Sequence, residues 1–105
     1  MVHASPLLVE GVLLDDDIVF SLHEMCRVCQ AEQTYLVALV HEGVLQPRGD
    51  GPDHWQFSGT SLGRARTAVR LARDLELGAA ATALVLQLLD RIDTLETHLR
   101  RVGHP

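Results

Sequence analysis

The residues of this sequence best suited to bind a metal are two cysteines three positions apart, Cys26 and Cys29, with His23 shortly before them. Thiolate and imidazole groups bind zinc, but a structural zinc ion takes four ligands. No second Cys/His pair stands at a suitable spacing, since His41 and His54 are isolated. Both cysteines fall on an apolar stripe, so we expect buried, reduced thiols and no metal site.

The sequence shows no pattern of residues that is typical of a catalytic or cofactor-binding site. The histidines show no arrangement with a serine or cysteine that would form a nucleophile and base. Gly49–Asp50–Gly51 indicates a turn, and no Gly-rich phosphate loop is present. Asp15–Asp17 lacks the spaced ligands of a calcium loop, so a solvated turn is expected there. We therefore expect no enzymatic activity and no cofactor.

The composition indicates one domain, or one small domain with an appended helix. The chain has 105 residues, of which 47% are hydrophobic, so it is able to bury a core. The net charge is -5, and all nine basic residues are Arg. An acidic chain is repelled by a polyanion unless its Arg residues cluster, so a basic protein partner is expected and nucleic acid is disfavoured. Without a signal-peptide pattern or a run of about 20 apolar residues, a cytoplasmic protein that does not enter the membrane is expected.

Residues 21–43 predict two short helices joined by a tight turn, the outline of a helix-turn-helix. Ser21 and Glu24 form a capping box at the start of the first helix, expected over 22–29. A turn over 30–32 leads to a second helix that ends at Gly43. Its inward residues are Leu36, Val37, Leu39 and Val40. Before these helices, residues 1–20 are expected to form an N-terminal arm with a possible strand or hairpin around Asp15–Asp17.

The stretch after the second helix predicts a β wing. Two β-like pieces, Val44–Gln46 and Trp55–Phe57, flank a segment rich in Gly and Pro. Ser58 is the expected N-cap of a third helix, which Gly78 breaks or bends. The inward residues of that helix are Leu62, Ala65, Val69, Ala72 and Leu75. We therefore expect a winged helix-turn-helix over 21–78.

The last helix, expected over about 79–102, carries one apolar seam. The seam repeats at steps of four and three, at Ala81, Val85, Leu88, Ile92, Leu95, Leu99 and Val102. This is the a and d pattern of a coiled coil, and so small a domain cannot hide a seam of this length. Residues 79–105 are therefore expected to form a coiled-coil helix and tail that joins two copies through Val85, Leu88, Ile92, Leu95 and Leu99. The alternative is that the first half of the seam packs back onto the helix-turn-helix.

The outer face of the second helix carries no Lys or Arg, and acidic residues stand at its two ends. This surface suits a protein rich in Lys or Arg better than it suits phosphate. The residues expected to bind such a partner are Glu32, Gln33, Tyr35, His41 and Glu42, with Tyr35 as an anchor. If the chain bound DNA instead, the contacts expected from charge are Arg48 on the wing together with Arg64 and Arg66 on the third helix. Arg66, Arg70 and Arg73 share one face of that helix, where they would contact phosphate, pair with nearby acids or meet a partner subunit.

Several motifs together resemble a known family. They span Phe20–Cys26, Leu36–Pro47, Trp55–Ser58, Ala68–Leu77 and Leu88–Pro105, within about residues 9 to 105. In order and content these pieces resemble the chaperone-modulator proteins of the CbpM type, relatives of the MerR-type winged helix-turn-helix regulators. The chain departs from the family pattern at Gln30, where Gly is frequent, and at Glu32, where Ser or Thr is frequent.

The resemblance implies a mainly α fold of MerR type with a small β wing and a long C-terminal dimerisation helix. It also implies a function: binding to the J-domain of a DnaJ-like co-chaperone of the CbpA type, with inhibition of its co-chaperone and DNA-binding activities. The alternatives are a MerR-like DNA-binding transcriptional regulator and a module whose only task is dimerisation. A J-domain presents a basic helix, which fits the acidic ends of the second helix.

Overall fold

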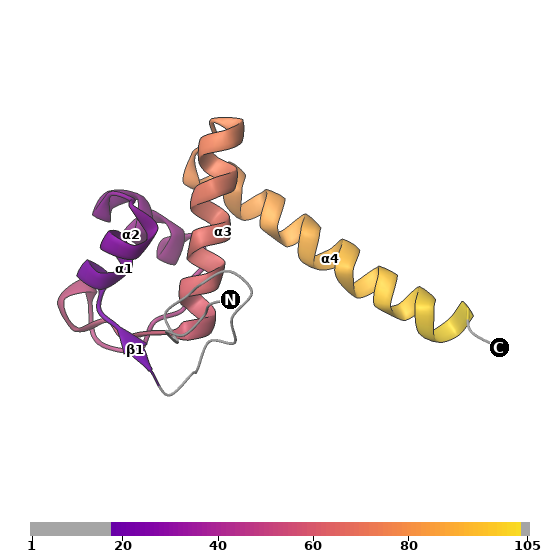
Figure 1. Ribbon diagram of the computed structural model, residues 1–105, viewed down its shortest axis with the longest axis horizontal. Coiled ribbons are helices and arrows are strands. Elements are labelled where there is room, and N and C mark those ends of the chain that lie inside the picture. The colour runs from indigo at the N-terminus through magenta and orange to yellow at the C-terminus, as the bar shows by residue number, and fades with distance from the viewer. Residues whose placement is uncertain (1–17, 104–105) are drawn as a thin grey trace, which may run out of the picture.

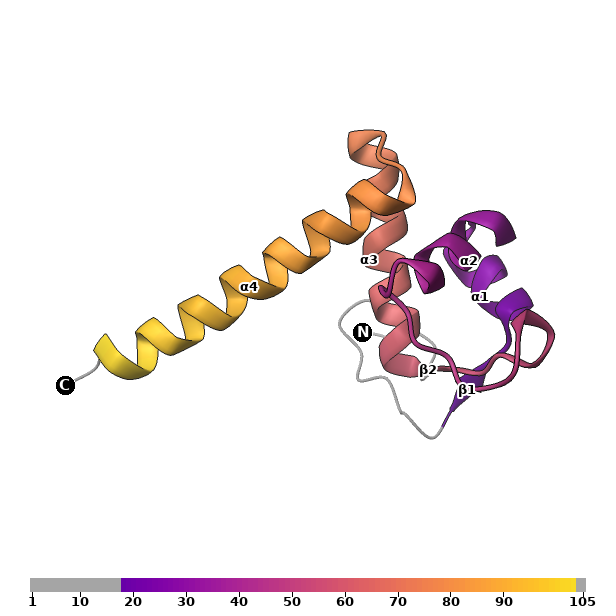
Figure 2. The same cartoon turned by 180° about the vertical axis from the view of Figure 1, so that it is seen from behind.

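The computed structural model describes residues 18–103. Within them, helices α1 (Leu22–Cys29), α2 (Gln33–His41) and α3 (Gly59–Leu75) form a body together with a two-stranded sheet, and helix α4 (Ala79–Gly103) extends from it (Figures 1 and 2). The strands are β1 (Val19–Phe20) and β2 (Phe57–Ser58), and a short 3-10 helix covers Pro52–His54. The hairpin expected around Asp15–Asp17 lies outside the described residues.

Helix α1 begins at the predicted capping box. The amide of Glu24 donates to Ser21 Oγ at 3.1 Å, and the amide of Ser21 donates to Glu24 Oε1 at 2.8 Å. The first amides of a helix have no partner within the helix, and the capping box satisfies two such donors. It stabilises the protein by on the order of 1 kcal/mol. The predicted bounds of this helix are confirmed.

The turn between α1 and α2 depends on a left-handed residue that is not glycine. Gln30 has φ 53°, a conformation that costs about 1 kcal/mol for a residue with a side chain. The amide of Ala31 donates to the Cys26 carbonyl at 3.1 Å, which closes the end of α1. Arg73 of α3 donates to the Gln30 carbonyl, so the third helix also holds this turn. The departure from the family pattern at Gln30 therefore leaves the helix-turn-helix intact.

The wing differs from the predicted hairpin. Val44–Gln46 forms no strand, and Val44 and Leu45 are buried in the core. The wing is closed by a single bridge, in which Arg48 and Gln56 exchange backbone hydrogen bonds of 3.0 and 2.8 Å. Strand β2 pairs with β1 instead, antiparallel, with Val19 opposite Ser58 and Phe20 opposite Phe57.

Helix α3 is the central element of the body. Ser58 is its N-cap as predicted, since Ser58 Oγ accepts from the amide of Ser61 at 3.1 Å. Of the predicted inward residues, Leu62, Ala65 and Val69 are buried in one core with residues of α1, α2 and β2. The prediction for Leu75 was wrong: its side chain is 56% exposed. The helix ends at Leu75 and Glu76 turns left-handed at φ 55°, so the chain leaves the core there.

Helix α4 has a packed face only near its start. Thr82, Ala83 and Leu86 are buried against the body, and the rest of the helix projects away from it. The radius of gyration is accordingly 15.1 Å, larger than the about 13 Å of a compact domain of this size. Within residues 18–103 no helix is both long and apolar enough to cross a membrane.

Candidate functional site

The predicted partner surface on α2 is exposed at both ends of the helix. Glu32 is the N-cap residue but makes no side-chain capping bond, so its carboxylate remains available. Gln33, His41 and Glu42 are likewise exposed. All of them belong to one short helix or to its caps, and this stretch contains no Lys or Arg.

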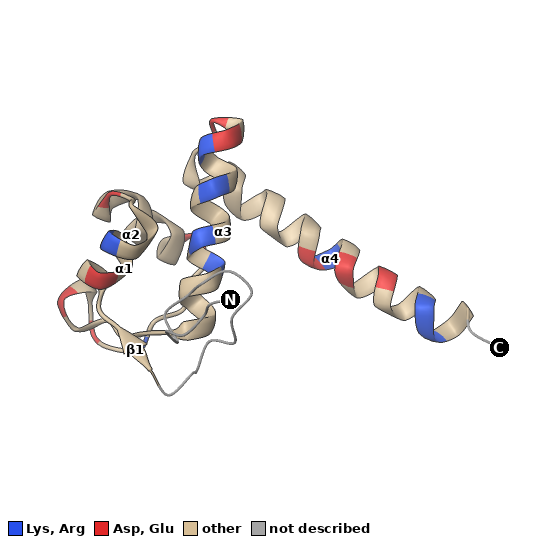
Figure 3. Ribbon diagram, viewed as in Figure 1, with Lys and Arg blue, Asp and Glu red and all other residues tan. Residues whose placement is uncertain are grey.

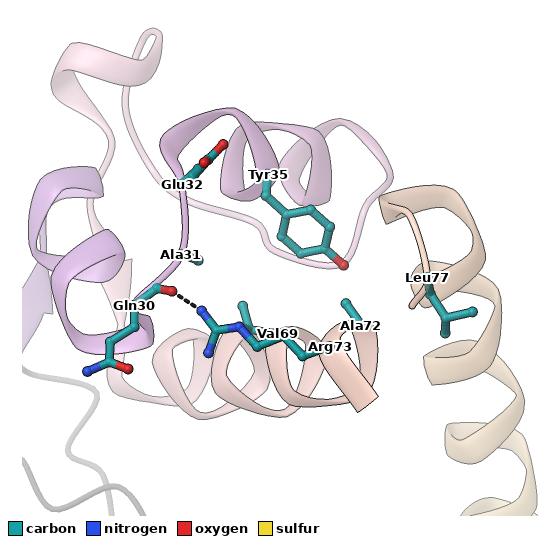
Figure 4. Close-up of a pocket in the computed structure, with 8 residues that line it drawn as sticks. All are labelled: Gln30, Ala31, Glu32, Tyr35, Val69, Ala72, Arg73 and Leu77. Carbon is teal, nitrogen blue, oxygen red and sulfur yellow. Dashed lines mark hydrogen bonds between the residues drawn. The ribbon is translucent and has the colours of Figure 1, made fainter. Parts of the chain in front are cut away.

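Tyr35 is half-buried, in contrast to the exposed anchor expected from the sequence. Its hydroxyl donates a hydrogen bond of 2.9 Å to Thr82 Oγ1 of α4. Its ring borders an open cavity of about 410 Å³ between α2 and α3. In Figure 4 the ring lies over this cavity, which Glu32 also lines, and Arg73 reaches across to Gln30. Tyr35 therefore contributes to attaching α4 as well as to the α2 surface.

The three arginines of the predicted DNA surface do not share one face. Arg64 is turned toward α4, where it forms an ion pair of 3.0 Å with Asp90. Its Nε also donates to the Val44 carbonyl at 3.1 Å. Arg66 lines a cavity on the α1 side of α3, and Arg48 is exposed on the wing. Because Arg64 is paired with Asp90 and the three arginines lie on different faces, they are poorly placed to contact phosphate groups together.

The predicted dimerisation seam is largely uncovered in the single chain. Leu88, Ile92, Leu95 and Leu99 are each exposed by half or more, while Val85 is half-buried. Leu84, Leu89 and Val102 extend this apolar surface. The face that packs onto the body is a different one, formed by Thr82 and Leu86, which the sequence analysis had not assigned. Helix α4 therefore has two apolar faces at its start, and only one of them is covered.

The two cysteines are free; Cys29 is buried and Cys26 is partly exposed. Cys29 is buried, and burial raises the pKa of its thiol to about 11, although the positive charge of Arg66 acts in the opposite direction. Burial also raises the pKa of Cys26. Within the part of the chain that the structure describes, no group of three or more His, Cys, Asp or Glu side chains is placed to hold a metal ion. These thiols have the properties of core residues.

Most of the net negative charge of the chain belongs to residues 1–17. Residues 1–17 hold four of the fourteen acidic residues and no Arg. Residues 18–103 hold the remaining ten acidic residues and all nine Arg, a net charge of -1, and both signs occur along the ribbon in Figure 3. Residues 18–103 are therefore almost neutral, and general repulsion does not by itself keep them from nucleic acid.

Comparison with known proteins supports the resemblance found in the sequence. The model of the MerR HTH family of regulatory proteins matches residues 20–103. The chaperone modulatory protein CbpM of Coxiella burnetii (strain Dugway 5J108-111) is 28% identical over 93 residues, which cover 89% of this chain and 88% of that protein. CbpM of Pseudomonas putida (strain W619) is 30% identical over 76 residues, covering 72% of this chain and 75% of the relative.

A third relative, CbpM of Pseudomonas entomophila (strain L48), is 26% identical over 76 residues, covering 72% of this chain and 75% of that protein. These relatives are named as modulatory proteins, and the family model describes regulators; neither is an enzyme family. The family match includes the helix-turn-helix, the wing and α4. The chain therefore belongs to the MerR HTH family of regulatory proteins and, within it, to the CbpM chaperone modulatory proteins.

Proposed function

We propose that this chain modulates a chaperone system by binding the J-domain of a DnaJ-like co-chaperone of the CbpA type. The bound chain inhibits the co-chaperone activity and the DNA binding of that partner. The chaperone-modulating role rests on the relatives named CbpM. The observation that carries the proposed contact is the exposed surface of α2, which has an exposed glutamate at each end and no Lys or Arg. A partner of this kind implies a cytoplasmic location.

The geometry of α2 suits a helical partner. The helix has nine residues, so its length is about 13 Å, and Glu32 and Glu42 bracket it. Two carboxylates at this spacing match basic side chains about two to three turns apart on a partner helix. Gln33 and His41 add hydrogen-bonding groups between the carboxylates. Charge pairs of this type set the association rate and the specificity more than the affinity.

Substitution of Glu32 and Glu42 together by Lys tests the contact. Binding of the isolated J-domain is measured by titration calorimetry at moderate ionic strength. We expect the affinity to fall about ten-fold or more, which corresponds to about 1.4 kcal/mol. The control is Asp50→Lys with Asp53→Lys, because these exposed wing residues give the same change in net charge. Unchanged binding by the α2 variant would show that the surface is misassigned, and an equal loss in both variants would show an unspecific charge effect.

We also propose that two copies associate through α4. The chain would then consist of an N-terminal arm (1–20), a winged helix-turn-helix (21–78) and a coiled-coil helix with its tail (79–105). The exposed seam supports this organisation, because four large apolar side chains at coiled-coil spacing are half or more exposed to water in a single chain. A dimer would present two α2 surfaces to its partners.

A DNA-binding regulator is the second candidate, and the near-neutral charge of residues 18–103 is the observation in its favour. In that case the expected contacts are Arg48, Arg64 and Arg66, of which Arg64 is paired with Asp90. Binding of duplex DNA would weaken steeply with salt. A pull-down with a DnaJ-like partner and, separately, with duplex DNA distinguishes the two candidates. Capture of duplex alone at moderate salt would replace the first proposal by the second.

A further inference from the structure

A basic groove runs between α1 and α3. It has a volume of about 430 Å³ and is lined by the end of α1 and by one face of α3. Arg66, Arg70 and Arg73 follow one another on that face, and Figure 3 shows the basic positions along α3 in blue. The three residues form a row about 10 Å long, at about 1.5 Å per residue. Asp74 is the acidic residue in the lining, so three guanidinium groups stand against one carboxylate.

The groove offers hydrogen-bond donors to a second molecule. Arg70 is exposed and makes no hydrogen bond or ion pair with another residue of 18–103. Arg73 donates one nitrogen to the Gln30 carbonyl, and a guanidinium group carries five N–H donors, so others remain. Burial raises the pKa of the Cys29 thiol, and the positive charges of Arg66 and Arg73 act against this effect. Both charges therefore lie near the floor of the groove.

The floor of the groove is apolar. It contains Val28, Cys29 and Val69, of which Cys29 and Val69 are buried. Val28 is half-buried and packs against the core. A molecule that carries only charge has nothing to place against these side chains. A protein segment suits the groove better, because it can present apolar side chains between its carboxylates.

A phosphate backbone matches this groove less well. A tight DNA-binding protein makes about six to ten phosphate contacts, whereas the row offers three basic side chains. The neighbouring cavity, which Arg73 also lines, has Glu32 in its lining. Residues 18–103 carry a net charge of -1, so no wider positive field adds to the row.

We propose that the groove between α1 and α3 binds an acidic helix of a partner protein. Its carboxylates pair with Arg70 and Arg73, and its apolar side chains pack against Val28 and Val69. Carboxylates at positions i, i+4 and i+7 of a helix have the same spacing as the three arginines, so a helix along α3 pairs with the whole row. Bidentate pairs between guanidinium and carboxylate groups fix the register of such a helix.

This docking surface goes beyond the proposed J-domain contact, which uses the glutamates at the two ends of α2. Peptide binding to the full chain tests it. The probe is a fluorescein-labelled, Ala- and Leu-rich helical peptide with glutamates at i, i+4 and i+7, and the control peptide carries glutamines there. Fluorescence anisotropy at low salt gives the affinities. We expect the Glu peptide to bind about ten-fold more tightly than the Gln peptide. Equal affinities, or no binding of the Glu peptide, would overturn the proposal.

Arg70→Glu tests whether the peptide binds in the groove. Because this side chain is exposed and unpaired within 18–103, the variant should stay folded, which circular dichroism checks. We expect its affinity for the Glu peptide to fall about ten-fold. The control is Arg101→Glu, which reverses an exposed charge on α4 and should leave the affinity unchanged. Equal losses in both variants would show an unspecific charge effect and contradict the proposal.

A short DNA duplex is titrated with the same proteins. We expect it to bind more weakly than the Glu peptide. A duplex that binds more tightly than the peptide, and that loses affinity with Arg70→Glu, would assign the groove to nucleic acid and remove the protein partner.

Discussion

The phenol group of Tyr35 in α2 donates a hydrogen bond of 2.9 Å to Thr82 Oγ1 in α4, although 47 residues separate them in the sequence. Thr82 is fully buried, and among residues 18–103 it is the polar residue that the core contains. A buried hydroxyl without a partner is costly, so this bond supports the position of α4 on the body. The Arg64–Asp90 ion pair adds a second contact about two turns further along α4.

Tyr35→Phe should lower the free energy of unfolding by about 1 kcal/mol, because it removes the donor and leaves the Thr82 hydroxyl without this partner. In a domain of this size the midpoint of thermal unfolding should fall by about 4–8 °C. Differential scanning calorimetry measures both quantities. The double variant with Thr82→Val should lose less than the sum of the single variants. If the losses of stability caused by the two single substitutions simply add in the double variant, the hydrogen bond contributes nothing to the free energy of unfolding.

Gly49→Ala should destabilise the wing, whereas Gly78→Ala should be neutral or slightly stabilising. Gly49 has φ 116°, and a Cβ atom there would collide with the His54 carbonyl group, which is backbone and cannot move aside. At Gly78 a Cβ atom would meet no other atom, and its φ is not in the left-handed region. We expect a loss of about 1–3 kcal/mol for the first and a change within about 1 kcal/mol for the second in urea unfolding. Equal stabilities would contradict the described wing conformation.

The stability of the protein should fall between pH 9 and pH 11 because of Cys29. Burial raises the pKa of this thiol from 9.0 to about 11, so in this range the folded state keeps a proton that the unfolded state has released. Unfolding therefore becomes easier as the pH rises, by at most about 3 kcal/mol from this group. The chain has no Lys, which limits the number of other titrating groups. Cys29→Ala should flatten this part of the pH profile measured by urea unfolding.

Leu95→Asp should convert a dimer to a monomer without unfolding the body. Leu95 is 51% exposed in the single chain, so the substitution disturbs the seam and not the core. Light scattering gives the mass, and circular dichroism reports the helix content. Thr94→Asp is the matched control, because Thr94 is also exposed and adjacent but is outside the seam. A Leu95→Asp protein that remains dimeric would assign self-association to another surface.

Local signals in the sequence were sufficient to predict the helices. Ser21 with Glu24 and the N-cap Ser58 fix two helix starts through bonds within four residues, and both were predicted correctly. The strand pairing was not predictable in the same way, because β1 and β2 are only two residues each and 36 residues separate them in the sequence. A pattern of alternating residues carries little information in so short a strand.

The remaining predictions for the candidate site that differ from the structure do so because they depend on contacts between elements that are distant in the sequence. The sequence placed Tyr35 on an exposed surface because nothing local indicates its bond to Thr82 of α4. Arg64 was indistinguishable from Arg66 by charge, and only the fold turns it toward Asp90. The composition gives one net charge for the whole chain and does not show that four of the five surplus negative charges belong to residues 1–17.

The uninterrupted course of α4 has a mechanical consequence. The helix runs from Ala79 to Gly103 without a break, and its first turns are fixed by Thr82 and Asp90. Because the first half of the helix is tied to the body, binding of another molecule to its last turns would constrain the orientation of the helix-turn-helix relative to that molecule.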